Sequence, residues 1–99
     1  MIPYSRQSID EDDIRAVIEV LKSDWLTQGP NVLAFEKALA EYSGARFAVA
    51  VPNGTAALYL AYKAIGLEEG DEIITTPNTF VATSNMALFC GARPVFCDI

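Results

Sequence analysis

Three loop-like segments carry the residue types that could do chemistry. The first, Pro52–Leu58 (PNGTAAL), lies between an apolar run and an Ala-rich helical pattern. A glycine at such a turn lets backbone amides approach an anion, and the start of the following helix adds free N–H groups and a positive dipole end. The Thr55 hydroxyl can donate a further hydrogen bond to a phosphate oxygen. A plain turn with Thr55 as the helix N-cap explains the segment equally well.

The second segment, Thr76–Asn85 (TPNTFVATSN), follows another apolar run. In open α/β sheets, ligands collect outside the carboxyl ends of the strands, and both segments leave such ends. Phe80 could present its ring to a planar ligand. The pattern alone favours burial of Phe80 in the core, because aromatic side chains dominate core burial.

The third segment, Asp24–Gly29 (DWLTQG), is irregular and contains a tryptophan and an amide side chain. This composition is typical of a binding loop, since loops carry function on a rigid scaffold. The favoured alternative is that Trp25 is a hydrophobic latch, which holds an N-terminal arm to the core. Tyr4, near the N-terminus, is a second aromatic residue of this kind and carries little weight by itself.

Composition excludes several other chemistries. The 99 residues contain 7 basic and 13 acidic side chains and no histidine, for a net charge of -6. A nucleic-acid binder needs a basic surface, and a nucleophilic serine, threonine or cysteine needs a base such as histidine. Cys90 and Cys97 have no metal-like spacing, which favours reduced thiols and a cytoplasmic protein. Lys22, Lys37 and Lys63 fall on helical patterns as ordinary solvated side chains, so none is assigned a catalytic role.

The elements that must position these loops follow from periodicity. Ser8 and Glu11 have the spacing of a capping box, and an apolar stripe at helical spacing follows it, which predicts a helix over 8–22. The other predicted elements are a helix over 31–43, a strand over 47–51, a helix over 56–65, a strand over 72–76, a helix over 79–90 and a strand over 94–97. Strand and helix alternate after Gly44, which predicts an α/β protein with a mostly parallel sheet.

The predicted organisation is an N-terminal helical arm with a loop over 1–44 and the start of a larger α/β domain over 45–99. The chain stops inside the last apolar strand pattern, whereas chain termini usually lie exposed at the surface. We therefore expect the sequence to be the N-terminal part of a longer polypeptide.

Taken together, the loops resemble one family. The stretches IPYSRQSID, LKSDWLTQGPNVLAFEKALAEYSGARFAVAVPNGTAALYLA and GDEIITTPNTFVATSNMALFCGARPVFCDI are similar to the DegT/DnrJ/EryC1/StrS sugar aminotransferases, and they cover nearly the whole chain in the family's order. The resemblance implies the N-terminal part of the fold-type I large domain of pyridoxal-phosphate enzymes, a mostly parallel sheet with helices on both faces. It also implies that the strand over 47–51 is separated from the other two by strands that lie beyond residue 99.

The resemblance also assigns site residues. The backbone of Gly54, Thr55 and Ala56 would hold the phosphate of pyridoxal 5'-phosphate, and Phe80 would stack on its pyridine ring, against the core interpretation. The positions that would line the nucleotide-sugar site are Tyr4, Asp24, Trp25, Leu26 and Thr27. No catalytic residue and no metal ligand is assigned within the 99 residues, because the family's cofactor-binding lysine lies beyond them.

The function implied is transfer of an amino group, usually from glutamate, to a keto-sugar nucleotide, at C4 of a UDP-linked 4-keto-6-deoxy-hexose. The resemblance further implies a homodimer. Three alternatives stay open: a sugar dehydratase of the same fold, in which a histidine replaces the lysine; a non-enzymatic α/β module that binds a phosphate or nucleotide; and a functionless fragment.

Overall fold

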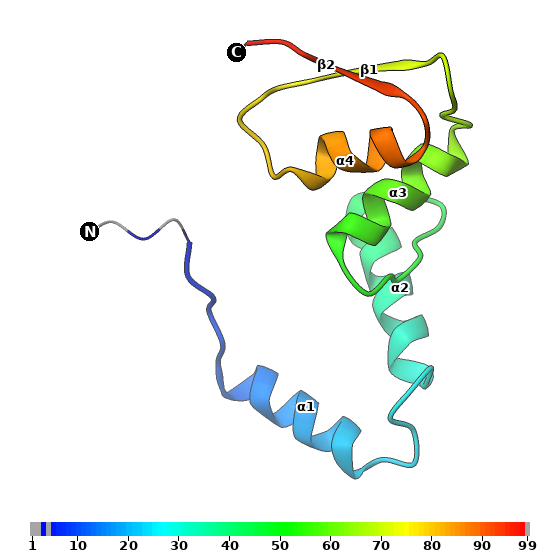
Figure 1. Cartoon of the computed structure of the whole chain (residues 1–99). Helices are drawn as coiled ribbons and strands as arrows, with labels where there is room; N and C mark the ends of the chain where they lie inside the picture. Colours follow the sequence, from blue (N-terminus) through cyan, green and yellow to red (C-terminus); the bar gives the residue numbers. More distant parts are fainter. Residues whose placement is uncertain (1–2, 4, 99) are drawn as a thin grey trace. The chain divides into compact units, whose positions relative to one another are not determined.

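The computed structural model describes residue 3 and residues 5–98, so Tyr4 lies outside the described part of the chain. The chain divides into two compact units, Met1–Ala50 and Val51–Ile99. Figure 1 labels the helices and strands of both. The assignment of domains to residues 1–44 and 45–99 stays a prediction.

In the first unit, α1 spans Glu11–Lys22 and begins later than predicted. Asp10 is its N-cap: its carboxylate accepts hydrogen bonds from the amides of Asp12 (2.9 Å) and Asp13 (3.1 Å), and the Asp13 carboxylate accepts one from the Asp10 amide (3.1 Å). The predicted capping box at Ser8 is therefore wrong. Asp10 is the N-cap because its capping box closes through Asp13. With this start, three acidic residues lie in the first turn, where the helix dipole favours negative charge.

The second helix of this unit, α2, spans Pro30–Ser43, one residue longer than predicted. Pro30 occupies the first turn, where its missing N–H costs no hydrogen bond. Gly44 ends the helix with φ 70°, a left-handed conformation that glycine adopts without strain. Within the described residues, α1 and α2 do not pack against each other.

The predicted strand over 47–51 is not formed. The segment is extended without a ladder, and the Ala50 amide donates a hydrogen bond to Glu36 Oε1 on α2 (2.8 Å). Phe47 and Val49 are each 74% exposed. A strand requires a partner for its backbone groups, and no strand of the described chain pairs with this segment. No ladder of the described structure joins the segment to the other two strands.

The second unit contains α3 (Gly54–Ala64), β1 (Glu72–Thr75), α4 (Ala82–Phe89) and β2 (Arg93–Phe96). The two strands pair in parallel, with Glu72 opposite Arg93 and Thr75 opposite Phe96. Glu72 and Arg93 also form an ion pair across the ladder. The predicted α/β class with a parallel sheet is confirmed, and the strand bounds differ from the predicted ones by one residue.

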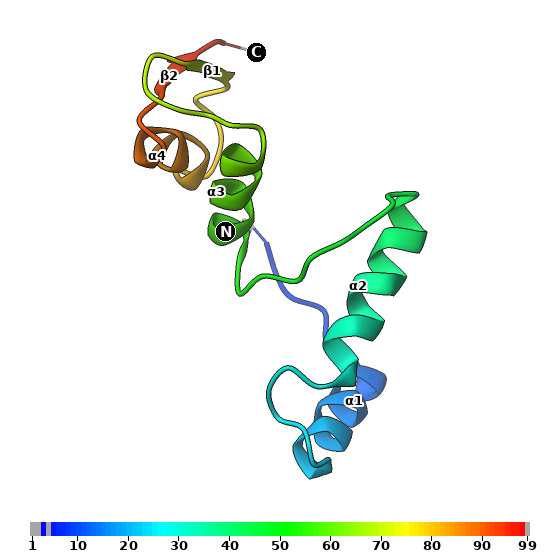
Figure 2. The ribbon, with the colours of Figure 1, turned by 90° about the vertical axis from the view of Figure 1, so that its right-hand side faces the viewer.

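The helices of this unit lie in layers below the sheet. Figures 1 and 2 show α4 between the two strands and α3, which agrees with contacts from α4 to both strands and to α3. Two small side chains at the centre allow this close approach: Ala87 is fully buried, and Ala92 is nearly so, beside the nearly buried Leu67. Ile73 packs against them from β1, whereas Ile74, on the opposite face of the strand, is 77% exposed.

The core is small for the length of the chain. No large side chain of the described residues is fully buried, and exposed aliphatic and aromatic side chains occur in both units. Among the described residues, no helix has the length and apolar character needed to cross a bilayer.

Candidate functional site

The start of α3 is built by Asn53. The backbone of Asn53 is extended, and its side-chain oxygen accepts a hydrogen bond from the Ala56 amide (2.9 Å). The backbone carbonyl oxygen of Asn53 accepts one from the Ala57 amide (3.1 Å). The alternative in which Thr55 caps the helix is therefore wrong. Sequence reasoning missed this role, although an asparagine directly before a helical pattern is a recognised N-cap signal.

The cap leaves two backbone donors without a protein acceptor. The amides of Gly54 and Thr55 lie in the first turn, where no helical carbonyl can reach them, and no hydrogen bond from either is formed within the described structure. The Thr55 hydroxyl has no hydrogen-bond partner there either. A Cβ added at Gly54 would meet nothing within 4 Å, so the space beside the turn is open. The Ala56 amide, by contrast, is already bonded to Asn53.

Phe80 lies in the loop that precedes α4. The helix begins at Ala82 rather than at Thr79 as predicted, because the chain first makes a turn. The Thr83 amide donates to the Phe80 carbonyl oxygen (3.1 Å) and the Asn78 amide to Thr76 Oγ1 (3.2 Å). The Phe80 side chain is 74% exposed, so it lies outside the core that the described residues form.

The two candidate segments belong to the same compact unit, Val51–Ile99. No hydrogen bond, ion pair or ring contact of the described structure joins Phe80 directly to Gly54, Thr55 or Ala56. A ligand held by both would therefore have to bridge the space between them.

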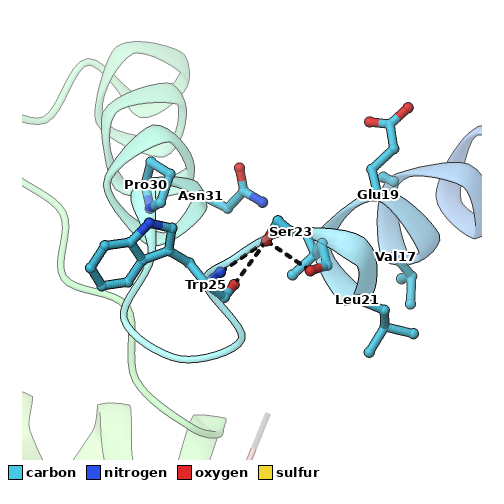
Figure 3. A pocket seen from close by; sticks show the side chains of 9 residues that line it. Val17, Glu19, Leu21, Ser23, Trp25, Pro30 and Asn31 are labelled. Carbon is cyan, nitrogen blue, oxygen red and sulfur yellow. Dashed lines mark hydrogen bonds between the residues drawn. The ribbon is translucent and has the colours of Figure 1, made fainter.

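The Asp24–Thr27 loop belongs to the first unit, between α1 and α2. Ser23 shapes it: Ser23 Oγ donates to the Val20 carbonyl oxygen (2.8 Å) and accepts from the Trp25 amide (3.2 Å), as Figure 3 shows. Sequence reasoning passed over Ser23, whose role depends on a helix end that periodicity locates only approximately.

Trp25 lines a cavity of about 650 Å³ together with residues of α1 and of the start of α2 (Figure 3). Its indole is 61% exposed, and Leu26 is 66% exposed. Gly29 is required beneath Trp25, because a Cβ at position 29 would lie 2.7 Å from the tryptophan Cβ. Asp24 and Thr27 are exposed, and neither makes a side-chain hydrogen bond within the described residues. Tyr4, the fifth predicted substrate residue, is outside them.

Comparison with known proteins decides the family. The sequence pattern of the DegT/DnrJ/EryC1/StrS aminotransferase family matches residues 7–99. The chain belongs to this family. The resemblance predicted from its loops is thereby confirmed, and the fold-type I assignment is confirmed by the solved structures that it matches.

Among curated relatives of this family member, the spore coat polysaccharide biosynthesis protein SpsC of Bacillus subtilis is 51% identical over 98 residues, which are 99% of this chain and 25% of that protein. The UDP-4-amino-4,6-dideoxy-N-acetyl-beta-L-altrosamine transaminase of Campylobacter jejuni (strain 81-176) is 48% identical over 99 residues, which are 100% of this chain and 26% of the relative. The IPY start and the SDWLTQGP loop had predicted a resemblance to transaminases of this kind.

Solved structures agree. The Helicobacter pylori aminotransferase PseC, involved in the biosynthesis of pseudoaminic acid, superimposes with a TM-score of 0.89 at 45% identity, over 98% of this chain and 27% of that one. A putative sugar aminotransferase of Streptococcus pneumoniae, in its PLP form, gives a TM-score of 0.88 at 35% identity, over 99% of this chain and 25% of that one. The chain thus spans about a quarter of the length of the relatives that it matches.

Proposed function

We propose that the whole protein is a pyridoxal-phosphate-dependent aminotransferase of nucleotide-sugar biosynthesis. It would move an amino group from a donor such as glutamate to C4 of a UDP-linked 4-keto-6-deoxy-hexose. The observation that carries the proposal is the family match over residues 7–99, together with 48% identity to a transaminase of a UDP-linked amino sugar. We further propose that the whole protein is a cytoplasmic homodimer, as the family resemblance implies.

The start of α3 fits the phosphate of this cofactor. The unpaired amides of Gly54 and Thr55, the free Thr55 hydroxyl and the positive end of the helix dipole supply donors to one anion. A third amide, that of Ala56, becomes available only if the Asn53 side chain turns away from it, because that side chain now accepts its hydrogen bond. Gly54 contributes through its backbone, so a small side chain at this position would leave the donors in place.

Phe80 fits the ring of the cofactor. A phenylalanine at 74% exposure leaves apolar area in water that a planar ring would cover. In this role Phe80 would cover one face of the ring and shield it from water. Asp24, Trp25, Leu26 and Thr27, with Tyr4, would contact the nucleotide sugar.

The bound cofactor would supply the electron sink that amino transfer requires. The described residues supply anchoring and orientation, and none of them is assigned a proton-transfer role. Two further residues would complete the site: the lysine that binds the cofactor covalently and the acidic partner of the pyridine nitrogen. We propose that both lie beyond residue 99 in the whole protein. The 99 residues alone would then have no transaminase activity.

The test uses the whole protein with pyridoxal 5'-phosphate, glutamate and a UDP-linked 4-keto-6-deoxy-hexose. Glutamate should bleach the visible absorbance of the bound cofactor, the keto sugar should restore it, and mass spectrometry should find an amino sugar nucleotide. Loss of the C3 hydroxyl without glutamate-dependent amination would instead identify a dehydratase. Nucleotide or phosphate binding without any cofactor absorbance would identify a binding module.

A further inference from the structure

Tyr62 connects the two parts of the candidate cofactor site through the protein. Its side chain is half-buried on α3 and packs against the core cluster of Leu67, Ala87 and Ala92. Its hydroxyl donates a hydrogen bond to the carbonyl oxygen of Thr83, 3.1 Å away and 21 residues along the chain. The anchored ring thus presents a donor to the first turn of α4 from outside that helix.

Thr83 holds the Phe80 loop in turn. Its amide donates to the Phe80 carbonyl oxygen (3.1 Å), and its hydroxyl lies 3.2 Å from the hydroxyl of Thr79. The carbonyl oxygen of Phe80 and the side chain of Thr79 are therefore both tied to Thr83. That residue is tied to Tyr62.

The helix that carries Tyr62 begins with the amides of Gly54 and Thr55. A hydrogen-bonded helix is stiff along its axis, so the Tyr62 bond and the packing of α3 against α4 together restrain its N-terminal end as well. We propose that Tyr62 is a positioning residue, whose hydroxyl sets the placement of Phe80 relative to the anion-binding start of α3. This inference rests on the proposed function, since it assumes that one ligand uses both ends.

The hydroxyl, rather than the ring, is the part that this inference concerns. Phenylalanine at position 62 would keep the packing against the core and remove only the bond to Thr83. The chain offers a matched control in Tyr59 on the same helix. Its ring makes an edge-to-face contact with Phe89 (centroids 5.5 Å apart), and its hydroxyl makes no hydrogen bond in the described structure.

The experiment compares Tyr62→Phe with Tyr59→Phe in the whole protein. Three quantities are measured: hydrogen exchange of the amides of residues 79–85 without cofactor, the dissociation constant and spectrum of pyridoxal 5'-phosphate, and the affinity for inorganic phosphate, which uses the α3 end alone. Tyr62→Phe should speed the exchange and leave the affinity for phosphate unchanged. It should raise the dissociation constant of the cofactor about three- to tenfold, which is the scale of one hydrogen bond. Tyr59→Phe should change none of the three.

A donor returned to the same ring position, by p-aminophenylalanine at position 62, should restore slow exchange and cofactor affinity, and it separates positioning from a general loss of stability. Equal effects of the two phenylalanine variants on a wild-type protein that binds the cofactor would overturn this inference and leave the proposed function standing. Absence of cofactor binding by the wild-type protein would overturn the proposed function and the inference with it.

Discussion

Thr55 and Asn53 divide two tasks at the start of α3, anion donation and helix capping. Thr55→Val keeps the side-chain shape and removes a hydroxyl that has no protein partner. We expect it to weaken cofactor binding by about 1–3 kcal/mol, the scale of a hydrogen bond to a charged group, with little change in the melting temperature. Cofactor titration and thermal melting of the whole protein measure both effects.

Asn53→Ala is the matched variant. It removes the side chain that accepts from the Ala56 amide, so we expect a loss of about 1 kcal/mol in the free energy of unfolding. If Thr55→Val destabilised the fold while Asn53→Ala did not, the assignment of the two tasks would be reversed.

The exposed fraction of Phe80 gives a way to tell a stacking role from a structural one. Because 74% of the side chain is exposed, Phe80→Ala should change the free energy of unfolding by only about 0.5 kcal/mol, whereas truncation of a core phenylalanine costs about 3–5 kcal/mol. The same variant should loosen the cofactor and shift its absorbance. A large stability loss with an unchanged spectrum would show that Phe80 is structural.

At the scale of elements, the N-terminus of α1 rests on Asp10. Asp10→Ala removes the acceptor of two amides and should destabilise the helix by about 1 kcal/mol, whereas Ser8→Ala should have little effect because Ser8 lies outside the cap. Faster hydrogen exchange of the α1 amides in the first variant alone is the expected result. Equal exchange in both variants would contradict the assignment.

The α1 start also shows what limited prediction from sequence. Both Ser8 with Glu11 and Asp10 with Asp13 have the spacing of a capping box, so that pattern could not choose between them. A second signal could have: with Asp10 as cap, Ile9 and Ile14 take the two positions of a hydrophobic staple, and both line the same surface cavity. The apolar stripe itself, which depends only on helical periodicity, was predicted correctly.

Elements with partners inside the chain were predictable, and the segment without one was not. The strands at Glu72–Thr75 and Arg93–Phe96 were located within one residue because each pairs with the other. The apolar run at 47–51 has the composition of a buried strand, but composition does not supply the partner that a ladder requires. For the site, the turn before the Ala-rich helix predicted the start of α3. The exposure of Phe80 was seen only in the structure, because periodicity alone favoured burial.

At the scale of the whole molecule, the main feature is the large number of exposed apolar side chains. The isolated 99 residues should be poorly soluble or partly molten. No large side chain among the residues that the structure describes is fully buried, and the extended segment at 47–51 leaves backbone groups unpaired beside exposed Phe47 and Val49. We expect dye binding to apolar surface, weak near-ultraviolet circular dichroism and no covalent attachment of the cofactor. A soluble monomer that melts cooperatively, with 47–51 in one sheet with the other strands, would contradict this.

The β1–β2 ladder has a consequence for the order of events during synthesis. Glu72 and Arg93, like every pair in that ladder, lie 21 residues apart, and the helix that connects the strands also supplies Ala87 to the core. A short separation keeps the entropy of loop closure low, so such a unit closes quickly once its last strand has left the ribosome. Its few buried side chains give it little resistance to reopening. It would therefore form early on the nascent chain and open and close repeatedly there.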